Sequence, residues 1–333
     1  MRRKRWWLLL PLVLVVAYLL GPHPSKPAYA KEMPVVPASP TELEQYVHIQ
    51  EAAHHIKPDN EARIVWFNDS LKNKTDYAIV YLHGFTASQG EGDPVHRDMA
   101  GRYGCNLYLS RLAEHGIDTT DALINLTADK YWESAKQALA IGKQLGKKVI
   151  LAGTSTGGTL ALQLAAAYPQ DVAALILMSP NIAINDPNAW LLNKPWGLQI
   201  ARMVKSSKYL ESKDTNHLYH QYWSSPYRIE AAVNLQELVS TTMNEKTFAQ
   251  VKQPAIVLYY YKDAVHQDST VKVSATLKMY DELGTPAAEK RAVAMPNAGD
   301  HVIGSYITSH DVQGVEAAIE KFMEEVLKIN PVK

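Results

Sequence analysis

A serine lies between two glycines in the stretch GTSTG, where Ser155 is flanked by Gly153 and Gly157. The apolar residues 149–152 before it are typical of a strand buried on both faces, and residues 159–168 after it are typical of a helix rich in Ala and Leu. A sharp turn from strand to helix exposes a serine hydroxyl above the sheet and needs glycines where the two elements pack closely. The pattern therefore predicts a nucleophile at Ser155.

A serine hydroxyl is a weak nucleophile at neutral pH, so this chemistry needs a base, a carboxylate that orients the base, and donors for an oxyanion. His301, in the loop NAGDHVIGS, is predicted as the base, and Asp263, just after the apolar run 255–261, is predicted as the orienting acid. Both follow predicted strands, as Ser155 does, and the carboxyl ends of parallel strands meet at one edge of a sheet. The three side chains are therefore expected to converge.

Asp268 is the rival of Asp263 for the role of orienting acid. The stretch AVHQDST is interpreted as the start of the next helix, with Asp268 as the residue that caps its N-terminus. Asp263 lies closer to the predicted end of the strand at Tyr261, where a side chain can lean over the sheet edge towards His301. We therefore predict Asp263, rather than Asp268, as the acid.

The stretch YLHGFTAS, at the end of an early predicted strand, supplies candidate oxyanion donors. The backbone N–H groups of Phe85 and Thr156 are expected to hold the oxyanion. His83 and Gly84 come just before Phe85, and His83 is expected to brace this loop rather than to take part in the reaction.

Strand-like runs alternate with helical patterns along most of the chain, which predicts an α/β fold with a mostly parallel sheet covered by helices on both faces. The first strands lack helices between them and are open to antiparallel pairing. The predicted strands lie within 62–68, 77–84, 105–110, 147–153, 174–180, 254–261 and 290–296, and the clearest helices lie within 95–103, 129–145 and 159–168.

Residues 181–252 contain no strand-like run and are rich in aromatic residues, so they are predicted to form a helical cap inserted between the two parts of the core, 61–180 and 253–333. Most of its aromatic residues are expected to form the core of the cap. Trp190, Trp196 and Trp223 are expected to line a substrate pocket where the cap meets the sheet.

The composition is that of a globular protein, with 333 residues, 47% of them apolar and 20% charged. Lys and Arg together number 34, as do Asp and Glu, so nothing in the charge balance suggests a nucleic-acid partner. Cys105 is the only cysteine, which excludes an internal disulfide and a cysteine metal cluster. The pairs His54/His55 and His217/His220 lack a metal-binding pattern such as H-E-x-x-H, so neither a metal nor a cofactor is expected.

Residues 1–30 begin with a basic stretch followed by apolar residues, as in a secretory signal peptide or an N-terminal membrane anchor. Ala28-Tyr29-Ala30 matches a small-x-small cleavage site, whereas the length of the uncharged stretch suits an anchor, and both alternatives stay open. In either case the rest of the chain is expected to be exported, and an uncleaved segment would attach it to the membrane. Residues 31–60 are interpreted as a proline-rich linker and a leading helix.

Together these motifs resemble the capped α/β-hydrolases, in particular bacterial carboxylesterases and monoacylglycerol-lipase-like enzymes. The matching stretches are His83-Gly84-Phe85, GTSTG around Ser155, Lys262-Asp263-Ala264-Val265 and Gly299-Asp300-His301, in the family's order Ser, Asp, His. The resemblance implies an acyl-enzyme mechanism in which Ser155 attacks an ester carbonyl. One departure is that Thr154 and Thr156 occupy both variable positions of the elbow, where the family has a bulkier first residue.

Three functions follow from these residues. The leading prediction is a serine hydrolase acting on small-molecule carboxylic esters. The alternative is a serine peptidase of the aminopeptidase or prolyl-peptidase type, which uses the same triad and usually binds the substrate amine through acidic residues in the cap. The third, a non-catalytic binding protein of the same fold, is disfavoured because the serine, aspartate, histidine and oxyanion loop are all intact.

Overall fold

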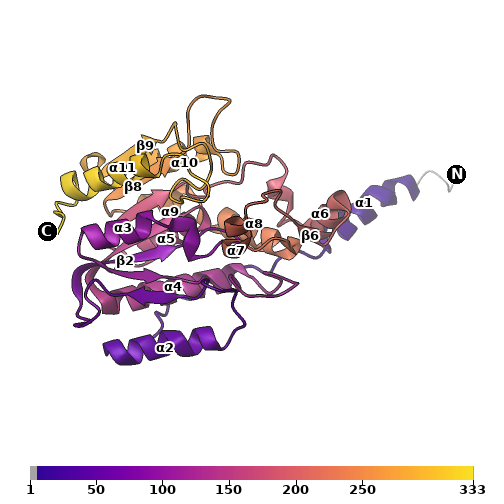
Figure 1. Cartoon of the computed structure of the whole chain (residues 1–333). Coiled ribbons are helices and arrows are strands. Elements are labelled where there is room, and N and C mark those ends of the chain that lie inside the picture. Colours follow the sequence, from indigo (N-terminus) through magenta and orange to yellow (C-terminus); the bar gives the residue numbers. More distant parts are fainter. Residues whose placement is uncertain (1–5, 333) are drawn as a thin grey trace.

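The protein has an α/β fold in which helices lie on both faces of one central sheet (Figure 1). This computed structural model describes residues 6–332. The sheet has seven strands in the order β1-β3-β2-β4-β5-β8-β9; β1 is antiparallel to β3, and the other neighbouring strands are parallel. The strands are β1 (Arg63–Val65), β2 (Thr75–Leu82), β3 (Asn106–Leu109), β4 (Gly146–Thr154), β5 (Ala174–Met178), β8 (Ala255–Tyr259) and β9 (Lys290–Ala294). The predicted mostly parallel sheet is confirmed.

The hydrophobic core forms two layers, one on each face of the sheet. Alternate residues of a strand point to opposite faces, so Val80 and Leu82 of β2 lie in one layer while Ile79 and Tyr81 lie in the other. The first layer is built with α4 (Ala128–Leu145) and α5 (Thr156–Ala167), and the second with α3 (Val95–Arg102) and α11 (Val312–Glu325). Burial on both faces explains the continuous apolar runs in the sequence.

The chain between β5 and β8 forms the inserted region, which carries more regular structure than its sequence indicated. A two-stranded antiparallel ladder joins β6 (Tyr209–Leu210) and β7 (Tyr227–Arg228). The sequence shows no strand-like run there because each strand is only two residues long. Helix α9 (Glu245–Gln250) contacts α5 and α10 (Val273–Glu282), so the last part of the insertion packs on the core. Its other elements are η3 (Ala189–Leu191), α6 (Gly197–Lys205), α7 (His217–Tyr222) and α8 (Ile229–Thr242).

The N-terminal region contains α1 (Trp6–Leu19), an extended segment and α2 (Pro40–Ala52). Helix α1 includes Pro11, and none of the helices within residues 6–332 is long and apolar enough to cross a membrane. The basic residues 2–5 predicted as part of an export signal lie outside the described residues.

The extended segment packs on α4 before residue 31. The indole N–H of Trp132 donates to the Ala30 carbonyl (2.7 Å), and the buried ammonium of Lys136 donates to the carbonyls of Ala30 (2.8 Å) and Glu32 (2.7 Å). Ala30, which belongs to the predicted signal peptide or anchor, thus packs on the core. Its backbone carbonyl satisfies buried donors of α4, a role that amino-acid composition does not reveal.

Candidate active site

Ser155 lies on the sharp turn between β4 and α5, at the carboxyl edge of the sheet. Its backbone has φ 52° and ψ −115°, a strained conformation for a residue with a side chain. The turn is fixed because the Ser155 N–H donates to the Met178 carbonyl (3.0 Å) and the Ser155 carbonyl accepts from the Asn181 N–H (2.9 Å). A Cβ atom at Gly157 would lie 1.8 Å from the Leu82 carbonyl oxygen, so only glycine lets α5 approach β2 this closely.

His301 forms its closest polar contact with Asp268. The imidazole Nδ1 lies 2.6 Å from Oδ2 of Asp268, and the two side chains are 11% and 1% exposed. The other carboxylate oxygen of Asp268 accepts the backbone N–H groups of Thr270 (2.8 Å) and Val271 (3.0 Å). Asp268 is thus held by its own loop and in turn orients the imidazole.

The prediction of Asp263 as the partner of His301 is wrong. Its carboxylate instead binds the His266 ring at 2.9 Å and accepts the Val265 N–H at 2.8 Å, and the Asp263 side chain is half exposed. The sequence suggested Asp263 because it lies near the predicted strand end, but position along the chain does not give position in space here.

The loop after β8 doubles back on itself, which explains why Asp268 rather than Asp263 contacts His301. Strand β8 ends at Tyr259, Tyr261 forms a bridge with Gln267, and the Asp268 N–H donates to the Tyr260 carbonyl (3.1 Å). Residues 262–266 therefore project away from the sheet, while Asp268 returns to the strand end. The interpretation of Asp268 as a helix cap is also wrong, because α10 begins at Val273 with Lys272 as its N-cap.

The charges of Asp268 and His301 support each other. Burial lowers the pKa of His301, but the Asp268 charge and hydrogen bond outweigh this effect and leave that pKa above its ordinary value. Burial raises the pKa of Asp268, but the imidazole and the two backbone N–H donors leave it below its ordinary value. The pair is therefore suited to an ionised carboxylate beside an imidazole that can accept a proton.

The loop of His301 packs next to the Ser155 turn. Val302 forms a small apolar cluster with Ala87 and Trp223, and a Cβ at Gly304 would lie 2.8 Å from the sulfur of Met178, the residue that binds Ser155. Within residues 6–332, the buried atoms His301 Nε2 and Thr156 Oγ1 have no hydrogen-bond partner. Buried polar atoms are rarely left unpaired in folded proteins, so unpaired atoms at this edge indicate a place where a ligand or reacting group binds.

The candidate oxyanion loop follows β2 and is held by His83. The Leu112 N–H donates to His83 Nε2 (2.9 Å), so Nδ1 carries the proton and donates to the Gly84 carbonyl (2.9 Å). Burial lowers the pKa of His83 to about 4, which keeps the ring neutral. In the described part of the chain the Phe85 N–H has no acceptor, and the Thr156 N–H belongs to the first turn of α5, where helix N–H groups lack internal partners.

The tryptophans predicted to line a pocket do not lie together. Trp223 is buried, stacks on Tyr219 at a ring separation of 4.8 Å, and contacts the cluster with Ala87. Trp190 is 56% exposed, and Trp196 is 40% exposed with its indole N–H on the Ala17 carbonyl of α1. Figure 1 shows α6, which follows Trp196, beside α1 and away from the sheet. Only Trp223 is brought next to the site.

Glu91 is a buried residue of this site that sequence reasoning missed. It lies in η2 (Gln89–Gly92), is 2% exposed, and accepts hydrogen bonds from the Gly84 N–H and the Tyr81 hydroxyl. A signal was available in the stretch QGEGDP, where a single acidic residue lies between glycines close to the oxyanion loop.

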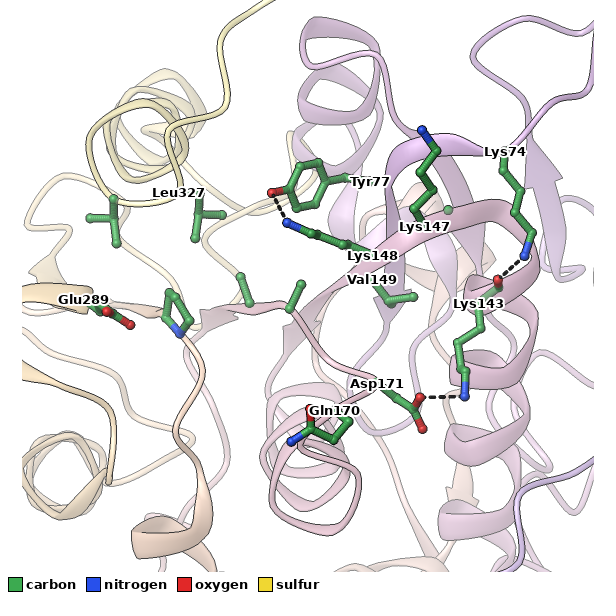
Figure 2. Close-up of a pocket in the computed structure, with 15 residues that line it drawn as sticks. Lys74, Tyr77, Lys143, Lys147, Lys148, Val149, Gln170, Asp171, Glu289 and Leu327 are labelled. Carbon is green, nitrogen blue, oxygen red and sulfur yellow. Dashed lines mark hydrogen bonds and ion pairs between the residues drawn. The ribbon is translucent and has the colours of Figure 1, made fainter.

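A cavity of about 640 Å³ lies at the opposite, amino edge of the sheet (Figure 2). Its lysines are mostly paired: Lys143 binds Asp171 at 2.6 Å, Lys74 donates to the Lys143 carbonyl at 2.8 Å, and Lys148 lies over the Tyr77 ring. These polar groups are already satisfied, so volume alone does not make this cavity the reactive site. No three His, Cys, Asp or Glu side chains among residues 6–332 are grouped so that they could hold a metal ion.

Comparison with known proteins identifies the family. A family model described as serine aminopeptidase, S33, matches residues 73–296, which is more than half of the chain. The chain belongs to this family of α/β-hydrolases. The matched region of this α/β-hydrolase includes Ser155 and Asp268, whereas His301 follows it. No curated protein matches the sequence.

Solved structures of lipolytic enzymes and esterases share the fold of this α/β-hydrolase. A structure from the metagenome-derived lipolytic enzymes LipS and LipT is 17% identical, covers 81% of this chain and 99% of its own, and has a TM-score of 0.64. A Paleococcus ferrophilus monoacylglycerol lipase is 13% identical (78% and 96% covered, TM-score 0.55). Est1E from Butyrivibrio proteoclasticus with ferulic acid bound is 16% identical (80% and 95% covered, TM-score 0.53). At these identities the likeness concerns the fold alone.

Proposed function

We propose that this α/β-hydrolase cleaves carboxylic esters through an acyl-enzyme intermediate, with Ser155 as nucleophile, His301 as base and Asp268 as the orienting acid. The observation that carries the proposal is the 2.6 Å contact between Asp268 and His301 Nδ1, which leaves the buried Nε2 without a partner next to the strained Ser155 turn. An imidazole oriented in this way can accept a proton from a serine hydroxyl.

In the acylation step, Ser155 Oγ forms a bond to the ester carbonyl carbon while its proton passes to His301 Nε2. The carbonyl oxygen becomes an oxyanion, for which the N–H groups of Phe85 and Thr156 are the proposed donors. The bond to the alcohol oxygen then breaks, His301 gives its proton to that oxygen, and the alcohol leaves. Asp268 stabilises the imidazolium throughout and keeps the proton on Nδ1.

In the deacylation step, a water molecule replaces the alcohol. It gives a proton to His301 Nε2 as its oxygen attacks the acyl carbon, and the same donors hold the second oxyanion. The bond to Ser155 Oγ breaks, the proton returns from His301 to Oγ, and the carboxylic acid is released. Both steps use the same groups in the same positions.

The acidic residues of the inserted region favour an ester over an N-terminal peptide as substrate. Glu230 binds Arg202 and Arg228, and Glu237 accepts a hydrogen bond from Asn193, so both are already paired. The remaining carboxylates of this region are on its exposed surface: Asp186, Glu211, Asp214 and Glu245. A substrate ammonium would need a buried, unpaired carboxylate.

The peptidase alternative remains the competitor, since the family model is described as a serine aminopeptidase. A panel of p-nitrophenyl esters of increasing chain length, measured beside aminoacyl anilides, separates the two. We expect turnover of the esters and at most weak turnover of the anilides. Greater kcat/KM on anilides would assign the site to peptides, and binding without turnover of either class would favour a non-catalytic role.

The place of action is a second part of the proposal. The basic and apolar composition of residues 1–20 supports export, and the bonds from α4 to the Ala30 carbonyl support retention of the N-terminal segment rather than cleavage after Ala30. Cell fractionation with N-terminal sequencing tests both points. We expect an extracytoplasmic product with an N-terminus before Ala28, whereas a cytoplasmic product would contradict export, and a start at Lys31 would contradict retention.

A further inference from the structure

Glu91 is a second buried carboxyl group at the candidate active site, on a turn that contacts the loop of His301: the Ser305 hydroxyl donates to the Gly90 carbonyl (3.1 Å). One carboxyl oxygen of Glu91, Oε2, accepts both the Gly84 N–H of the oxyanion loop and the Tyr81 hydroxyl (3.1 Å). The Tyr81 hydroxyl also lies 3.0 Å from Oγ1 of Thr154. Because the Tyr81 hydroxyl donates its hydrogen bond to Glu91, the Thr154 hydroxyl must donate to the Tyr81 oxygen. A continuous chain of hydrogen bonds thus joins the oxyanion loop to the nucleophile elbow.

This chain explains the threonine that departs from the family pattern. Thr154 immediately precedes Ser155 and is fully buried, as is Tyr81. A bulky apolar residue in place of Thr154 would leave the Tyr81 hydroxyl without its donor. The small hydroxyl side chain therefore has a specific partner beneath the elbow.

The position of Glu91 is tightly defined by the glycines around it. A Cβ at Gly84 would lie 2.5 Å from Glu91 Oε1 and 3.1 Å from the Ser155 Cβ, so the carboxyl and the serine both border the space that a side chain at Gly84 would fill. A Cβ at Gly90 would lie 2.5 Å from the Tyr222 ring, and a Cβ at Gly92 would lie 2.4 Å from the Tyr81 ring. The turn that carries Glu91 is packed between the inserted region and the sheet.

The charge of Glu91 is coupled to that of His301. Burial raises the pKa of Glu91 to about 7, and the Gly84 N–H, the charge of His301 and the Tyr81 hydroxyl oppose that rise. Conversely, Glu91 contributes to raising the pKa of His301, after the larger effect of Asp268 and ahead of Asp300. The ionised form of Glu91 therefore favours the protonated form of His301.

Other titratable groups near Glu91 and His301 are uncharged at neutral pH. Burial lowers the pKa of His96, whose ring packs 4.8 Å from that of Tyr81, to about 3. Burial raises the pKa values of Tyr81, Tyr131 on α4 and Tyr219 on α7. The charged groups that act on His301 are thus Asp268, Glu91 and Asp300.

We propose that Glu91 is a positioning residue of the active site, whose carboxylate ties the oxyanion loop to the nucleophile elbow and whose negative charge stabilises the imidazolium form of His301. The proposal rests on the serine-hydrolase function proposed above. As the Ser155 proton moves to His301, the positive charge that develops is met by two buried carboxylates, one that binds Nδ1 and one that lies under the oxyanion loop.

The test compares the pH dependence of ester kcat/KM in the wild type, Glu91→Gln, Tyr81→Phe and the double variant. Glutamine has nearly the same shape, and its carbonyl oxygen can accept both hydrogen bonds, so only the charge is removed. Without that charge His301 loses its proton more readily, so the acid limb of the pH profile of kcat/KM should move to lower pH by about 0.5–1 unit. This limb should also fit a single ionisation, that of His301. The plateau should fall about tenfold, because the imidazolium is less stable in the transition state.

Tyr81→Phe removes a donor that favours the charged carboxylate, so it should move the limb in the same direction by a smaller amount. It should add no further shift in the Glu91→Gln background, because the charge is then already absent. Asp300→Asn is the matched control, since it also removes one negative charge beside His301 but at a partly exposed position. The acid limb of its pH profile should move by less than about 0.3 units, because water screens the charge of Asp300.

The outcomes separate this proposal from the proposed function. A fluorophosphonate probe should label Ser155 in the wild type and in every variant. A wild-type protein that is neither labelled nor active on esters would contradict the serine-hydrolase function. With an active wild type, an unshifted acid limb in Glu91→Gln would overturn the role of the Glu91 charge. A loss confined to aminoacyl substrates would overturn it as well, because Glu91 would then bind a substrate amine. Thermal melting monitors folding, and if Glu91→Gln does not fold, an unshifted limb in Tyr81→Phe overturns the proposal.

Discussion

The two edges of the central sheet carry polar side chains that differ in burial and in pairing. At the carboxyl edge, Asp268 is 1% exposed at its side chain, and the His301 Nε2 atom is buried without a partner in the described structure. At the amino edge, the large cavity is lined by lysines that have partners (Figure 2). The side chain of Lys147 there is 70% exposed and pairs with Asp76.

We infer from this difference that the carboxyl edge, rather than the cavity at the amino edge, is the reactive site. An exposed ion pair costs little to form and contributes little, because water screens both charges. A buried and partly unpaired group costs stability, so it persists where it has a chemical role. We therefore expect large losses of activity from substitutions at the carboxyl edge and small ones at the amino edge.

The largest effect is expected at Ser155. Ser155→Ala should lower ester turnover by about 10⁴- to 10⁶-fold, as removal of a triad nucleophile does. Alanine adds no atoms beyond the Cβ that serine already has, so the melting temperature should change little. Residual turnover within tenfold of the wild type would remove Ser155 from the mechanism.

The aspartates of the loop after β8 provide a comparison within one segment. Asp268→Asn should lower turnover by about 10⁴-fold at neutral pH, because asparagine holds His301 in the wrong tautomer. Asp263→Asn should leave turnover within about twofold, since the contacts of Asp263 are with Val265 and the exposed His266 at the tip of the loop. Steady-state rates of both variants decide which aspartate is the orienting acid. An inactive Asp263→Asn beside an active Asp268→Asn would reinstate Asp263.

A smaller effect is expected where the inserted region meets the sheet. Trp223→Phe should change the preference for acyl chain length by up to about tenfold, because Trp223 packs beside the loops of Ala87 and Val302 and the smaller ring buries less apolar surface. Trp190→Phe is the control at an exposed position and should leave the preference unchanged. Equal effects of both substitutions across a series of esters would show that Trp223 does not shape the pocket.

The smallest effect is expected at the amino edge. Lys143→Ala removes the ion pair with Asp171 that lines the cavity, yet turnover should stay within twofold because the site is at the other edge. The free energy of unfolding should fall by less than about 1 kcal/mol, the range of exposed ion pairs. A loss of turnover as large as that of Asp268→Asn would contradict the contrast between the edges.

The positions of Ser155 and His301 at one edge could be predicted from the sequence because each follows directly from a local pattern. The GTSTG turn joins a buried strand to a helix, and parallel strands bring their carboxyl ends together. The same reasoning located the α/β fold, since buried parallel strands are recognisable as continuous apolar runs.

Asp268 and Glu91 could not be predicted in the same way because their positions depend on how loops fold. The bridge between Tyr261 and Gln267 returns Asp268 to the strand end, and no residue pattern in this segment revealed it. Glu91 reaches the site because the Gly84, Gly90 and Gly92 backbones leave room for close packing, which is a property of the assembled structure. Ala30 likewise joins the fold through its backbone carbonyl alone.

The most direct measurement of the central claim is the mapping of a fluorophosphonate label by peptide mass spectrometry, with the rate of labelling compared among variants. We predict a label on Ser155 alone and no label in Ser155→Ala. The labelling rate should fall by orders of magnitude in Asp268→Asn and stay near that of the wild type in Asp263→Asn. A label on another residue, or an unlabelled Ser155 in a protein that hydrolyses esters, would contradict the placement of the active site at the carboxyl edge.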